Sequence, residues 1–197
     1  MLHKSEISDK LAAIALSWGI LLGLPSAAQA AEYKIDPAHS FIQFRVSHLG
    51  IGFVFGRFNT LEGNFTYDPA AGPSAQKVSV TIDTASVDTN HAERDKDLRS
   101  DKSLNVEMYP QVTFESTGYS GDADGGTLTG DLSYRGVTKS ISFPIKLIAE
   151  GDDPWGGYRA GFEAKYTLLR KDFGEDRDFG PKGETVVLEI IIEGIRQ

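Results

Sequence analysis

The densest group of residues capable of chemistry lies between positions 86 and 105, in the stretch SVDTNHAERDKDLRSDKSLN. It combines carboxylates, amides, one histidine and two arginines, the groups that bind cations or move protons. A calcium-binding loop over residues 88–99 is excluded, because Ala92 stands where an oxygen ligand belongs, Glu93 replaces the turn glycine and Arg99 replaces the closing glutamate.

A transition-metal site has little support from the same stretch. His91 and Asp95, four residues apart, offer only two ligands on one helical face, and His39 and His48 belong to a distant strand region. The chain has no cysteine, no G-x-S-x-G motif and no recognisable pair of catalytic carboxylates. We therefore predict no metal, no cofactor and no enzymatic activity.

A helix accounts for this stretch better. Asn90 can cap it with Glu93 three residues later, and opposite charges recur at spacings of three and four residues. Most of this helix is expected to face solvent, but one stripe of it should point toward the sheet or toward the mouth that the sheet forms. It consists of His91, Arg94, Asp95 and Leu98.

The N-terminus has the pattern of a cleavable export signal. A polar head is followed by an apolar run over residues 11–24 and by the small-residue triplet Ala28-Gln29-Ala30. Fourteen apolar residues at about 1.5 Å each are too short to span a bilayer, so we expect a signal peptide over residues 1–30 and a periplasmic location. One domain is predicted over residues 31–197.

Composition narrows the class of partner. The net charge is −8, and the chain must fold without disulfides. This acidity argues against nucleic acid or an anionic membrane surface as the main partner, and no stable membrane insertion is expected. It leaves open a lipid carried inside the protein and a homodimer.

Strands must provide the scaffold, because apolar residues recur with period two from Tyr33 onward. About eight strands with short connections predict an all-β fold, an extended antiparallel β-barrel with a short helix beside it. The predicted inward faces are Ile42, Phe44, Val46 and His48; Val78, Val80 and Ile82; Val112 and Phe114; Leu128, Leu132 and Tyr134; Ile141, Phe143, Ile145 and Leu147; and Phe162, Ala164, Tyr166 and Leu168.

Two segments and one proline fit this pattern less well. Residues 53–68 indicate a bent strand, and residues 184–195 are apolar on both faces, as in a covered strand. Pro144 requires a bulge or an edge-like position. An eight-stranded barrel either fills with its own side chains or holds one slender ligand, and a self-filled core remains the alternative at each inward position.

Seven stretches of the chain form a recognisable series: YKIDPAHSFIQFRVSHLG (33–50), FGRFNTLEGNFTYD (55–68), SVDTNHAERDKDLRS (86–100), YPQVTFEST (109–117), LTGDLSYRGVTK (128–139), GDDPWGGYRAGFEA (151–164) and RKDFG (170–174). In these stretches, the chain resembles the YceI-like family of polyisoprenoid-binding, lipocalin-like barrels, and the match is closest to its periplasmic branch. Ser103 departs from the family, which tends to have an aromatic residue there.

The resemblance implies a long apolar pore that takes up an isoprenoid chain, such as that of a quinone or a polyprenyl phosphate, and implies no catalytic residues. Fatty acids or amides as cargo, or an enzyme acting on an isoprenoid lipid, remain alternatives. The expected ligand-binding residues are Ile42, Phe44, Val46, His48, Phe55, Val80, Ile82, His91, Arg94, Leu98, Phe114, Leu132, Ile141, Phe143, Phe162 and Tyr166. Of these, His48, His91 and Arg94 are expected near the headgroup.

Overall fold

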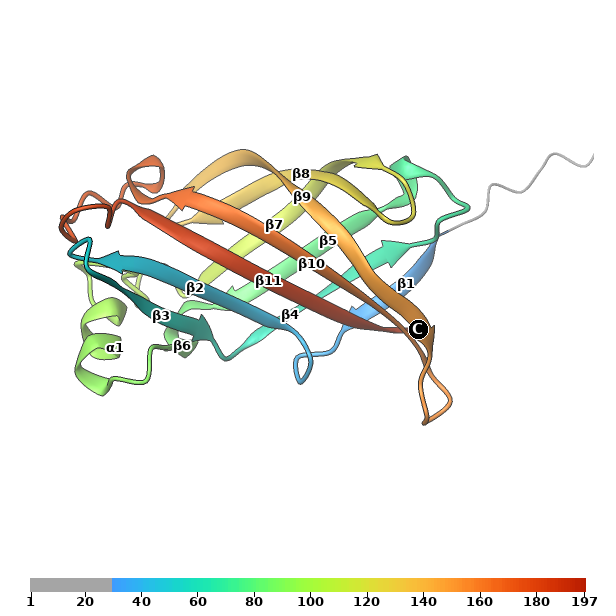
Figure 1. Ribbon diagram of the computed structural model, residues 1–197, viewed down its shortest axis with the longest axis horizontal. Coiled ribbons are helices and arrows are strands. Elements are labelled where there is room, and N and C mark those ends of the chain that lie inside the picture. Colours follow the sequence, from blue (N-terminus) through green and yellow to red (C-terminus); the bar gives the residue numbers. More distant parts are fainter. Residues whose placement is uncertain (1–29) are drawn as a thin grey trace, which may run out of the picture.

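The computed structural model describes residues 30–197, so the predicted signal peptide lies almost entirely outside the described residues. Strands dominate this part of the chain (Figure 1). In chain order, the elements are β1 (Ala31–Ile35), β2 (Phe41–His48), β3 (Gly52–Phe58), β4 (Leu61–Tyr67), η1 (Pro73–Ala75), β5 (Lys77–Asp83), η2 (Thr84–Ser86), β6 (Val87–Asp88), α1 (Ala92–Arg99), β7 (Gln111–Gly121), β8 (Gly125–Tyr134), β9 (Val137–Asp152), β10 (Tyr158–Leu169), η3 (Arg170–Phe173) and β11 (Thr185–Arg196).

The sheet closes into the predicted eight-stranded antiparallel barrel. Its ring runs β1-β4-β5-β7-β8-β9-β10-β11, and pairing between β11 and β1 completes the circle. Closure satisfies the backbone groups that an open sheet would leave at its two edges. Among residues 30–197, no helix is long and apolar enough to cross a membrane.

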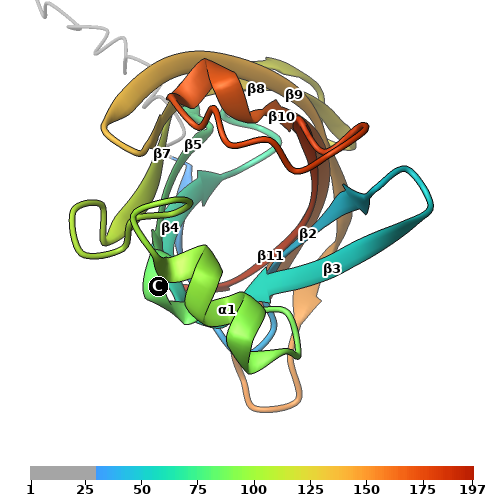
Figure 2. The same ribbon diagram turned by 90° about the vertical axis from the view of Figure 1, so that its left-hand side faces the viewer.

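Strand β11 corresponds to the segment whose sequence is apolar on both faces, and it changes its partner along its length. Its residues Val186 to Ile191 pair with β2, whereas its last residues pair with β1. β2 then pairs with β3, and β3 pairs briefly with β6, so these three strands extend the wall at one end of the barrel. Figure 2 shows α1 lying across the mouth at that end.

Pro144 occupies an edge-like position, as its missing N–H requires. It pairs with Thr127 of β8 on one side, while the β9–β10 ladder on the other side ends at Ile145. The missing N–H of Pro144 therefore removes no hydrogen bond from the ladder between β9 and β10.

The inward residues form two clusters, one around Tyr33 and Phe65 and the other around Tyr134 and Phe173. Two inward glycines let aromatic rings lie flat on the wall: a Cβ would come within 2.3 Å of the Phe44 ring at Gly56, and within 2.4 Å of the Phe114 ring at Gly130. The interior is thus lined by rings held against the strands rather than filled across its centre by them.

Candidate functional site

An elongated apolar cavity of about 250 Å³ runs inside the barrel. Along β11 its lining extends from Val186 to Ile192, which corresponds to about 20 Å of strand. The walls combine the inward faces of strands that are far apart in the sequence. Twelve residues expected from the sequence to face the pore line it: Ile42, Phe44, Val46, Val80, Ile82, Leu98, Phe114, Leu132, Ile141, Phe143, Phe162 and Tyr166.

Phe143 occupies the middle of this lining. Its ring centroid lies 5.5 Å from that of Phe114 and 5.8 Å from that of Tyr166, both in tilted arrangements. Aromatic pairs of this kind are favourable beyond their buried area and hold the rings in place. The cavity wall is therefore an organised aromatic surface suited to a thin hydrocarbon.

Four of the expected ligand-binding residues lie away from the cavity lining. His48 ends β2 at an exposed turn, where its carbonyl accepts from the backbone N–H of Ile51. Phe55 is 64% exposed on the outer face of β3, because Val54 and Gly56 occupy the inner positions. A strand's alternation admits two registers, and the bent segment did not reveal which one applied.

The start of α1 gives His91 and Arg94 local partners, and neither residue lines the cavity. His91, rather than Asn90, is the N-cap, and its Nδ1 accepts from the backbone N–H of Arg94 at 3.2 Å. Arg94 donates to the hydroxyl and the carbonyl of Thr89, at 2.7 and 2.8 Å. Buried Asp95 also accepts from Thr89, so this stripe fastens the preceding loop to the helix. Leu98 alone of the stripe reaches the cavity.

A buried polar cluster, which we call the Arg170 cluster, lies at the α1 end of the cavity. Its members Ser103, Tyr134, Arg170 and Glu175 all line the cavity and are all buried. Glu175 is the centre: its Oε1 accepts from Arg170 Nη1 at 3.0 Å and from the Ser103 hydroxyl at 2.9 Å, and its Oε2 accepts from the Tyr134 hydroxyl at 2.8 Å.

Arg170 is held from several sides. Its Nε donates to the carbonyl of Gly183 at 3.0 Å, and its Nη2 donates to the carbonyl of Arg177 at 2.9 Å. The guanidinium also lies 3.7 Å from the ring centroid of Phe179, which lines the cavity too. Three of its five N–H groups are therefore engaged within the described residues, and one remains on each Nη atom.

The electrostatics of the cluster favour hydrogen bonding to a polar ligand atom. Burial, and then the negative charge of Glu175, raise the pKa of Tyr134, so its hydroxyl keeps its proton at neutral pH. The side chains of Arg170 and Glu175 are only 6% and 4% exposed, and they compensate each other's charge. Such a pair is tolerated in an apolar setting because its lone pairs and protons find partners.

The cluster was missed at the level of sequence, although Arg170 belongs to the quoted RKDFG stretch. Ser103 and Tyr134 are 72 and 41 residues from Glu175, and no local spacing connects them. The one available signal was Ser103, which departs from the family's aromatic preference and here provides a hydroxyl to Glu175. Further lining residues not expected to bind ligand include Phe58, Phe65, Tyr67, Val186, Leu188, Ile190 and Ile192.

A second group of charges, the Arg159 cluster, lies outside the barrel at its other end. Arg159 donates to Asp36 and Glu193 at 2.7 and 2.6 Å through Nη1, and to Asp153 at 2.9 Å through Nε. Arg159, followed by His39, lowers the pKa of Asp36 to about 2. Asp36, His39 and Glu193 offer ligand atoms within 4.8 Å of one another, but the guanidinium already bonds both carboxylates.

Comparisons with known proteins identify the family. The YceI-like domain matches residues 33–193. A relative from Pseudomonas aeruginosa (strain LESB58), described as a UPF0312 protein, is 54% identical over 193 residues, or 97% of this chain and all of the relative. The chain belongs to the YceI-like family, as the sequence resemblance predicted.

Two solved structures share the fold. The Campylobacter jejuni YceI protein is 28% identical, with a TM-score of 0.69 over 77% of this chain and 90% of that protein. A polyisoprenoid binding domain from Saccharophagus degradans, implicated in plant cell wall breakdown, is 17% identical, with a TM-score of 0.62 over 85% of this chain and 99% of that domain. The lipocalin-like barrel is thus shared well beyond recognisable sequence identity.

Proposed function

We propose that this protein binds a polyisoprenoid lipid in its barrel and carries it through the periplasm, with the lipid's headgroup against the Arg170 cluster. The observation that carries the proposal is the combination of a long apolar cavity with one buried polar end. That combination matches an amphiphile with one polar terminus. The related fold described as a polyisoprenoid binding domain supports the choice of cargo.

The energetics support a long chain as ligand. Each buried carbon contributes about 0.8 kcal/mol, so a five-carbon isoprene unit contributes roughly 3 to 4 kcal/mol before the costs of ordering are subtracted. The aromatic walls around Phe143 supply the apolar surface for this burial. The chain's net charge of −8 favours keeping such a complex dissolved in water.

The headgroup is proposed to be an acceptor of hydrogen bonds. The remaining N–H groups of Arg170 can donate to a quinone carbonyl or to a phosphate oxygen. Both headgroups therefore present an oxygen atom that can accept these hydrogen bonds. The role is binding rather than catalysis, because the cluster's groups are engaged with one another and lack an activated nucleophile arrangement.

Lipid extraction tests this function. Protein purified without detergent from its host should release an isoprenoid lipid, identified by mass spectrometry, in close to molar proportion. Fatty acids or amides in its place would favour the alternative cargo, and absence of any lipid would contradict the proposal. Chemical turnover of the bound chain during incubation would indicate an enzyme instead.

The periplasmic location rests on the Ala28-Gln29-Ala30 triplet. N-terminal sequencing of the protein from a periplasmic extract should find Ala31 as its first residue. Recovery of the chain with Met1 in the membrane fraction would refute export with cleavage.

A further inference from the structure

The β2–β3 hairpin exposes large apolar side chains in a way that the lipid cavity does not explain. Its exposed fractions are 52% for Leu49, 88% for Ile51, 57% for Phe53 and 64% for Phe55. We call these four residues the hairpin patch. Contiguous apolar side chains on a surface mark a site that meets another apolar phase.

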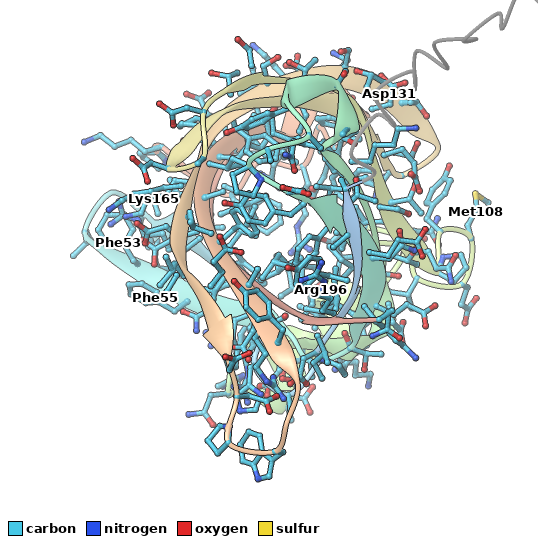
Figure 3. The ribbon with its side chains drawn as sticks, turned by 90° about the vertical axis from the view of Figure 1, so that its right-hand side faces the viewer. Phe53, Phe55, Met108, Asp131, Lys165 and Arg196 are labelled. Atoms are coloured by element: carbon cyan, nitrogen blue, oxygen red, sulfur yellow. The ribbon has the colours of Figure 1, made fainter. Side chains whose placement is uncertain are left out.

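The hairpin patch projects from the barrel. Figure 2 shows β2 and β3 leaning away from the wall, and Figure 3 shows Phe53 and Phe55 outside the ring of strands. The two rings lie 6.4 Å apart on the outer face of β3, and Ile51 sits in the turn ahead of them. The patch is therefore convex, with its most exposed residue near the tip.

The hairpin carries positive charge of its own, although the protein is acidic overall. Residues 41–58 contain Arg45 and Arg57 and no aspartate or glutamate; Arg57 lies opposite Asp88 of β6, so Arg45 is the cation of the hairpin that adjoins the patch. The guanidinium of Arg45 lies 4.9 Å from the ring centroid of Phe53, and Lys182 lines the same depression beside the hairpin. Cations beside exposed aromatic and aliphatic side chains are typical of a surface that contacts anionic lipid headgroups.

The hairpin patch adjoins the polar end of the cavity. The Ser47 hydroxyl donates to the carbonyl of Pro181 at 3.2 Å, and Leu49 packs against Gly180. The next residue back, Phe179, lines the cavity and covers Arg170 at 3.7 Å. A surface bound to the tip would thus lie beside the mouth where a lipid headgroup is proposed to rest.

We propose that the hairpin patch docks the protein on the surface of a bilayer containing anionic lipid. In a symmetric contact between two copies of the hairpin, Arg45 beside Phe53 of one copy would approach Arg45 of the other. This like-charge approach disfavours a second copy of the chain as the partner of the patch. Docking on a membrane is a separate property from binding of the lipid cargo, so an experiment can refute one of them without refuting the other. The contact is peripheral and transient, because only a short hairpin enters the interface.

Vesicle co-sedimentation tests the docking. Wild-type protein should bind vesicles made of equal amounts of phosphatidylcholine and phosphatidylglycerol. Its binding should be about tenfold weaker to vesicles of phosphatidylcholine alone, and about tenfold weaker to the mixed vesicles at high salt. The double variant Phe53→Ser/Phe55→Ser should lose about tenfold or more of this binding. The control Ile148→Ser/Trp155→Ser, which removes exposed apolar groups from the β9–β10 region, should bind as wild type does.

A fluorescence reporter identifies which part of the protein meets the bilayer. In an Ile51→Trp variant on a Trp155→Phe background, anionic vesicles should shift the emission to the blue. Trp155 of the wild type is 79% exposed and belongs to the β9–β10 connection, which lies at the opposite end from the β2–β3 turn (Figure 1), so its emission should not shift. No vesicle binding by the wild type, equal losses in the control variant, or a blue shift of Trp155 would each overturn the proposal. So would a hairpin variant that dissociates a dimer without changing vesicle binding.

Discussion

Two arginines anchor charge clusters at opposite ends of strand β10, and they differ in what lies beside them. Arg159, near the start of the strand, bonds three carboxylates on the outside of the barrel. Arg170 follows the end of the strand, is buried with one carboxylate, and faces the cavity. Arginine thus has two roles here: Arg159 holds a surface loop in place, whereas Arg170 presents hydrogen-bond donors to an apolar cavity.

The difference shows how burial changes the role of an ion pair. The Arg159 side chain is 20% exposed, so water screens its bonds and can replace any one of them. The Arg170 pair is desolvated, so each lost bond is costly and each unused N–H favours a polar partner. The Arg170 cluster is therefore the better candidate for a ligand contact, and the Arg159 cluster for holding the β1–β2 loop.

The largest effect is expected from a charge placed inside the cavity. Phe143→Glu would put a carboxylate among the rings of Phe114 and Tyr166, at a cost of several kcal/mol, and should abolish lipid co-purification. The matched control Ile148→Glu changes an exposed position of the same strand and should retain the lipid. Lipid content is measured by mass spectrometry, and circular dichroism verifies that each variant folds. Unchanged lipid in folded Phe143→Glu would favour a self-filled core.

Removing one carboxylate from each cluster compares them directly. Glu175→Ala leaves buried Arg170 without its counter-charge and should lower the free energy of unfolding by about 3 to 5 kcal/mol. Asp36→Ala leaves Arg159 with Asp153 and Glu193, so about 1 kcal/mol or less is expected. Urea unfolding measures both values. Equal losses would contradict the distinction between the two ends.

Arginine-to-lysine changes test the ligand contact with a smaller loss of stability than Glu175→Ala, because they keep the positive charge. Arg170→Lys keeps the charge but loses the guanidinium fork, so lipids with a quinone or phosphate headgroup should bind about tenfold more weakly. A polyprene hydrocarbon of equal length should bind as it does to the wild type, and Arg159→Lys should leave all three ligands unaffected. A loss that is equal with and without a headgroup would mean that Arg170 supports the cavity wall only.

The smallest effect concerns pH at the Arg159 cluster. The pKa of Asp36 is lowered to about 2, so its stabilising contribution is full above about pH 4 and is lost as the pH falls toward 2. Asp36→Asn should therefore be less stable than the wild type by about 1 kcal/mol at pH 6 and nearly equal to it at pH 2. Thermal unfolding across this range measures the difference, and a gap that persists at pH 2 would refute the assignment.

The sequence predicted the barrel and most of the cavity wall because both depend on a local rule. Alternation fixes which residues of a strand share a face, and so Phe44, Val80 and Phe143 could be placed inward before their neighbours were known. The rule failed at Phe55, where a bent strand permits either register. It also could not choose a face for β11, whose sequence is apolar on both sides; in the structure, alternate residues from Val186 to Ile192 line the cavity.

The polar end of the cavity could not be predicted by such a rule. The Arg170 cluster joins a strand end, a turn and a loop whose side chains meet only after the barrel closes. The helix stripe of His91 and Arg94 could not be interpreted from spacing alone, because helical spacing predicts which residues share a face and not what that face contacts. Here it contacts its own preceding loop.

The central claim is that a lipid headgroup lies at the Arg170 end of the cavity. A polyprenyl ligand with a photoreactive group in its head, crosslinked in the barrel and located by peptide mapping, tests this most directly. The account predicts crosslinks to peptides containing Ser103, Tyr134 or residues 170–179. Crosslinks confined to Tyr67, Gln76 or Tyr119, which line the other end, would contradict it.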